Sequence, residues 1–74
     1  MNKTIVLQTR QALTTKLTAL AGASQLNITL SLPTATELQS AFHGDVNAIE
    51  VVNLKYMTAI ADLLTALETR EDAS

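Results

Sequence analysis

The chain has 74 residues, enough for one domain, and a domain of this length buries only about 60% of its unfolded surface. It contains no cysteine, which excludes disulfides and thiolate metal sites, and its single histidine, His43, has no carboxylates at ligand spacing. We therefore expect no catalytic residue, no cofactor and no metal, and a fold whose stability depends on contacts with other chains.

Charge is unevenly distributed along the chain, although the net charge is only −2. Residues 1–36 contain Lys3, Arg10 and Lys16 and no acid, whereas residues 37–74 contain two cations against seven acids, a net −5. The two halves could attract each other within or between chains, or they could form two ordinary solvated surfaces.

Residues 4–21 are predicted to form a first helix. Val6, Leu13, Leu17 and Leu20 share one stripe, and Gly22 is suited to the left-handed position that ends a helix. Residues 4–7, the first three of which are β-branched, allow an alternative, a short strand that pairs with a later strand of the same chain.

That later strand is predicted at residues 26–32, where apolar and polar residues alternate until Pro33. A period of two is typical of a half-buried strand. The alternating apolar residues are Leu26, Ile28, Leu30 and Leu32, and the polar ones are Asn27, Thr29 and Ser31. Its simplest partner is the same strand of a second copy across a two-fold axis. We expect a mainly α, small α+β fold with three helices and this one strand, paired across a homodimer.

Two more helices are predicted after the strand. Thr34 and Glu37 have the spacing of a capping box, which starts a short helix over residues 34–42. Gly44 should end that helix and Asp45 should cap the next one, which is predicted over residues 46–69. The polar residues 70–74 are expected to fray. All these elements belong to a single domain, residues 1–74.

The last helix is apolar over an unusually wide arc. One stripe consists of Ile49, Val52, Tyr56, Ile60, Leu63 and Leu67, and a second of Leu54, Met57, Ala61 and Leu64. One helix and one strand can hardly cover both stripes, so we expect burial against other chains. The residues predicted to form the oligomer or partner interface are Leu26, Ile28, Leu30, Leu32, Val52, Tyr56, Ile60, Leu63 and Leu67.

The stretch Ile28-Thr29-Leu30-Ser31-Leu32-Pro33, followed by two helices, resembles the ribbon–helix–helix regulators of transcription. The resemblance covers residues 26–33. It implies a dimer whose paired strands read the major groove of DNA through Asn27, Thr29 and Ser31. However, this ribbon has no Arg or Lys, and the acidic second half of the chain would repel phosphates.

The sequence therefore favours a small non-enzymatic interaction or assembly module over a DNA-binding regulator. We expect it to bind itself, as a homodimer or higher oligomer, and another protein. A component of a larger complex such as a virus particle would fit. The longest apolar runs are too short to cross a bilayer, and the first residues lack the apolar core of a secretory signal. The expected location is the cytoplasm or a virion.

Overall fold

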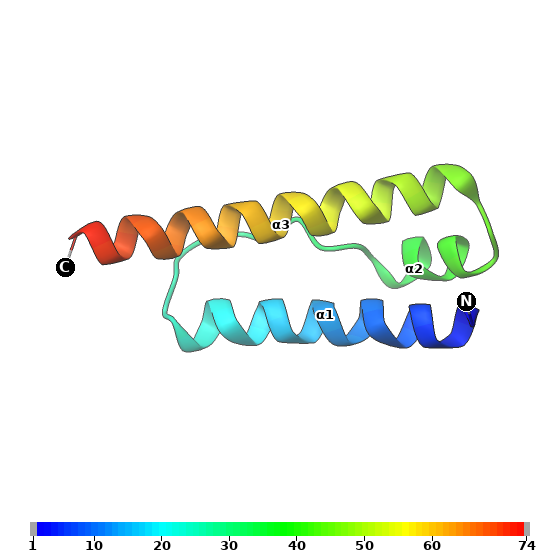
Figure 1. Ribbon diagram of the computed structural model, residues 1–74, viewed down its shortest axis with the longest axis horizontal. Helices are drawn as coiled ribbons and strands as arrows, with labels where there is room; N and C mark the ends of the chain where they lie inside the picture. The colour runs from blue at the N-terminus through cyan, green and yellow to red at the C-terminus, as the bar shows by residue number, and fades with distance from the viewer. Residues whose placement is uncertain (1, 74) are drawn as a thin grey trace.

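The computed structural model describes the backbone of residues 2–73 and the side chains of residues 2–70. In this part of the chain there are three helices: α1 (Lys3–Ala23), α2 (Ala35–Phe42) and α3 (Val46–Ala73). Helices α1 and α3 lie side by side and run in the same direction (Figure 1). The segment between α1 and α2 returns along the helix pair, so that α2 lies near the start of α1. The molecule measures 45 × 20 × 19 Å.

Helix α1 includes residues 4–7, so the alternative of a strand at this position is wrong. Asn2 caps the helix: its side-chain oxygen accepts a hydrogen bond of 2.8 Å from the backbone N–H of Thr4. Leu7 and Leu13 then pack against the core. The β-branched residues follow this cap into the helix, because packing decides the outcome where intrinsic propensity differs by only a fraction of a kcal/mol.

The predicted strand at residues 26–32 is also wrong, although the mainly α class is confirmed. No strand or sheet occurs in residues 2–73. Residues 25–33 are extended or irregular, and the backbone N–H of Leu32 bonds the carbonyl of Leu30 in a local turn. A strand needs a partner ladder for its backbone groups, and the one candidate within the chain, residues 4–7, is helical.

The helix ends have the predicted capping residues, except at the end of α1. The capping box of Thr34 and Glu37 is confirmed, with both reciprocal hydrogen bonds present. Gly44, with φ of 91°, ends α2, and Asp45 accepts from the N–H of Ala48 at the start of α3. At the end of α1 the left-handed residue is not Gly22.

The left-handed residue after α1 is Gln25, with φ of 56°. The N–H of Leu26 bonds the carbonyl of Ala21, and the N–H of Gln25 bonds that of Gly22, which together form a Schellman motif. Helix α1 therefore ends at Ala23 rather than residue 21. Helix α3 extends to Ala73, past its predicted end at residue 69.

We expect Gln25→Gly to raise the free energy of unfolding by about 0.5–1 kcal/mol. A left-handed conformation strains a residue with a Cβ by about 1–2 kcal/mol, and glycine removes this strain while losing more entropy on folding. Gly44→Ala is the reverse change, because it puts a Cβ on a residue with positive φ, and it should destabilise the protein. Urea titrations of both variants measure the two changes, and a destabilised Gln25→Gly protein would contradict the assignment.

The core lies where the three helices meet, and α3 contributes half of it. Its buried residues are Leu17, Ala21, Leu38, Ala41, Val52, Tyr56, Ala59 and Leu63. Tyr56 also joins α3 to α1 through its hydroxyl, which donates to the carbonyl oxygen of Arg10 at 2.5 Å and lies 2.7 Å from Thr14 Oγ1. This buried polar group is therefore satisfied, and it fixes the register of the two long helices.

An ion pair fastens α2 to α3: Lys55 Nζ lies 2.6 Å from Glu37 Oε1. The Glu37 carboxyl accepts a hydrogen bond from Lys55 and another from the backbone N–H of Thr34. Both bonds, that from Lys55 more strongly, lower the pKa of this carboxyl below its ordinary value of 4.5. A pKa lowered by folding contributes stability above the unfolded-state value, and this contribution is lost as the pH falls through the folded-state value.

We therefore expect acidification below about pH 4.5 to lower the melting temperature of the wild type more than that of Glu37→Gln. Glutamine keeps the capping box but removes the charge at position 37. The other carboxylates are the same in both proteins, so their effect on the melting temperature cancels in the comparison. Melting curves from neutral to acidic pH measure the difference. Parallel curves for the two proteins would show that Glu37 has no role in the acid response.

Candidate protein-interaction surface

The interface residues predicted on α3 lie mostly inside a single chain. Val52, Tyr56 and Leu63 are buried in the core, and Leu67 packs at its edge. Ile60 is the exception, with 36% of its surface exposed. Contacts with α1, α2 and the extended segment therefore already bury most of the stripe that the sequence assigned to a second chain.

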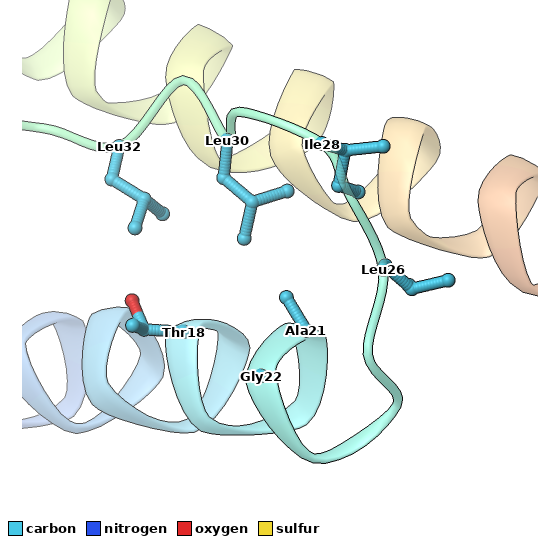
Figure 2. Close-up of a pocket in the computed structure, with 7 residues that line it drawn as sticks. All are labelled: Thr18, Ala21, Gly22, Leu26, Ile28, Leu30 and Leu32. Carbon is cyan, nitrogen blue, oxygen red and sulfur yellow. The ribbon is translucent and has the colours of Figure 1, made fainter.

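The predicted strand residues line a hollow beside α1. Leu26, Leu30 and Leu32 are half-buried and pack against the core, whereas Ile28 is 37% exposed. Figure 2 shows Leu30 and Leu32 pointing toward α1. The hollow has a volume of about 320 Å³, and its lining has no titratable group: Thr18, Ala21, Gly22, Leu26, Ile28, Leu30 and Leu32. Such a lining can exclude water, but it offers no acid, base or nucleophile beyond one threonine hydroxyl.

We expect Leu30→Asp to destabilise the protein by about 1 kcal/mol, because it removes a half-buried apolar contact and places a carboxylate beside the hollow. Thr29→Asp is the matched control, since Thr29 is exposed. Thermal unfolding of both variants tests this. Equal losses at the two positions would mean that the side chains of the segment do not pack as the structure has them.

A second hollow lies between the start of α1 and the corner that joins α2 to α3. Its volume is about 190 Å³, and its lining combines two cations with apolar side chains: Lys3, Val6, Arg10, Ala41, Phe42, Gly44 and Ile49. His43 caps the end of α2 and is exposed, with its ring 5.3 Å from that of Phe42. Across the side chains described, no three His, Cys, Asp or Glu residues gather as metal ligands would.

Three of the large apolar side chains that the chain exposes lie together on α3, facing away from the core. Leu54, Met57 and Leu64 expose 61%, 62% and 54% of their surface. Together with the exposed Ala61 they recur at i, i+3, i+7 and i+10, the spacing of a coiled-coil seam. We call these four residues the outer stripe. They are the second apolar stripe of the sequence, and the structure leaves them uncovered in the single chain.

Exposed acids lie beyond both ends of the outer stripe and on one flank of α3, whereas both cations of α3 make contacts elsewhere. Lys55 pairs with Glu37 of α2, and Arg70 donates to the backbone carbonyl of Ser24 just after α1. The acids Glu50, Asp62 and Glu68 are exposed, and no ion pair involves them among residues 2–70. The outer surface of α3 is therefore apolar in its middle and has the uncompensated carboxylates Glu50 and Glu68 beyond its two ends.

Asn27, Thr29 and Ser31, the residues implied in DNA contact by the resemblance, are exposed. The ribbon that would present them requires a strand, which residues 2–73 lack. No helix in this range is long and apolar enough to cross a membrane. Neither a known protein family, nor a curated protein, nor a solved structure matches this chain. Its function must therefore be inferred from its own surface.

Proposed function

We propose that this protein is a non-enzymatic interaction module that binds another protein through the outer stripe of α3. The observation that carries the proposal is the exposure of Leu54, Met57 and Leu64, each more than half accessible and all on one helix face. Single exposed leucines are common, but a row of them at seam spacing is typical of an interface.

The energetics of the stripe support the same function. Covering its three large side chains would contribute on the order of 1–2 kcal/mol each, from the apolar surface removed from water. Ile60 and Val51, exposed by 36% and 39%, extend the surface on either side. Folding a 28-residue helix does not require these residues to be apolar, since their side chains contribute little to the core. A partner chain gives them a role.

Site-specific photocrosslinking in cells of the native source tests the proposal. A photoreactive amino acid at position 57 should form a covalent adduct with another protein, because Met57 lies in the middle of the stripe. The matched control is the same amino acid at Gln8, which is exposed on α1. Leu54→Asp and Leu64→Asp should abolish the adduct without changing the circular dichroism spectrum. Equal adducts from positions 57 and 8 would contradict the proposal.

A further inference from the structure

We infer that the partner of the outer stripe is an amphipathic helix with a basic residue at each end of its apolar seam. This inference rests on the proposed function and specifies its partner. The stripe alone would accept any apolar helix. The charges that border it in the structure are what distinguish one class of partner from another.

The first step is the position of two acids on the axis of the stripe itself. Glu50 precedes Leu54 by four residues, and Glu68 follows Leu64 by four. Residues four apart lie on the same face of a helix, one turn from each other. The outer stripe, about 15 Å long, thus has a carboxylate one turn beyond each end, and the two acids are about 27 Å apart along the axis. Val46, which is 66% exposed, lies a further turn before Glu50 and outside the outer stripe.

The second step is that the protein itself does not neutralise these acids. Lys55 and Arg70, the cations of α3, bond to Glu37 and to the Ser24 carbonyl instead. Glu50 and Glu68 are exposed and unpaired within residues 2–70. A lysine or arginine of a bound helix, one turn beyond each end of its seam, would meet them and fix its register.

A second copy of the chain is a poorer occupant than such a helix. If two copies paired their stripes antiparallel about the middle of the seam, Glu50 would face the second copy's Glu68. If they paired in parallel, Glu50 would face Glu50. Both arrangements place like charges together at both ends of the seam, which opposes association.

The same charges disfavour other macromolecules. Nucleic acid and anionic lipid surfaces both present phosphates, which the acids at the two ends of the stripe would repel. A helix with basic ends gains attraction at both ends in either orientation, because the acids stand symmetrically about the seam. The surface therefore specifies the charge at the ends of the partner helix but not whether that helix runs parallel or antiparallel to α3.

The test uses two synthetic helical peptides with the same apolar seam. One peptide has Lys one turn beyond each end of the seam, and the other has Glu at these positions. We expect the full-length protein to bind the Lys-ended peptide about tenfold more tightly at low salt, since two exposed ion pairs replace two repulsions. Fluorescence anisotropy measures both affinities. Raising the salt concentration should reduce the preference.

Variants of the protein provide the controls. The double variant Glu50→Lys/Glu68→Lys should invert the preference in favour of the Glu-ended peptide. Asp62→Lys changes a charge about 100° around the helix from Ala61 and should leave the preference at nearly the wild-type value. Leu64→Asp should abolish binding of both peptides, because it disrupts the stripe itself.

The outcomes separate this inference from the proposed function. Equal affinities for the two peptides, with binding of both abolished by Leu64→Asp, would overturn the inference of basic ends on the partner. The outer stripe would still be an interface. Binding of neither peptide, combined with self-association of the wild type that Leu64→Asp abolishes, would identify a second copy as the occupant. Peptide binding that survives Leu64→Asp would contradict the proposed function as well.

Discussion

Leu63→Ala should lower the free energy of unfolding by about 2–5 kcal/mol, the cost of removing a buried leucine and leaving a cavity. Leu63 is only 2% exposed and belongs to the central cluster of the core. For 74 residues the total stability expected is about 4–11 kcal/mol, so this loss would be a large fraction of it. Urea unfolding followed by circular dichroism measures the change.

Its matched control is the next residue along the same helix. Leu64 is 54% exposed and lies about 100° around the helix from Leu63, so Leu64→Ala deletes the same atoms from an exposed position and should change the stability by less than about 0.5 kcal/mol. The pair separates burial from helix propensity, because leucine and alanine are both good helix formers. If both variants lost the same stability, the orientation of α3 relative to the core would be wrong.

The helices and their ends could be predicted from the sequence because the signals are local. Thr34 with Glu37, and Gly44 with Asp45, specify helix boundaries through hydrogen bonds that span only a few residues. Asn2 is a similar local signal for the start of α1, and its cap favours a helix over a strand at residues 4–7.

The strand prediction failed because a period of two reports alternating burial rather than hydrogen bonding. Leu26, Leu30 and Leu32 do turn partly inward, and their polar neighbours are exposed, much as the alternation indicated. An extended segment packed on helices gives this pattern as readily as a strand does. Within one chain no second strand completes the ladder among residues 2–73, so the segment stays extended and packs on the helices instead.

The candidate surface was partly predictable for a related reason. Helical periodicity indicated two apolar stripes on α3, although it placed Ile60 in the buried one and left the fully buried Ala59 out of both. It could not show which stripe the rest of the chain covers. That choice depends on tertiary contacts, such as the hydrogen bond from Tyr56 to the Arg10 carbonyl and the ion pair of Lys55 with Glu37. These contacts turn the first stripe inward and leave Leu54, Met57 and Leu64 outside.

Ala59→Leu should be the most damaging enlargement within α3. Ala59 has no exposed surface and lies in the core cluster between the turns of Tyr56 and Leu63. Protein interiors are close-packed, so three added carbon atoms force neighbouring side chains or the helices apart, at a cost of about 1–3 kcal/mol. Thermal and urea unfolding of the purified variant measure the loss.

Ala61→Leu makes the same change on the outer stripe, where Ala61 is exposed. There the added side chain meets solvent, so the stability should stay within about 0.5 kcal/mol of the wild type. The larger seam should instead bind the Lys-ended peptide more tightly, because more apolar surface is covered on association. The same Ala→Leu substitution would thus affect folding at position 59 and binding at position 61. Unchanged peptide affinity in Ala61→Leu would argue that the middle of the outer stripe does not contact the partner.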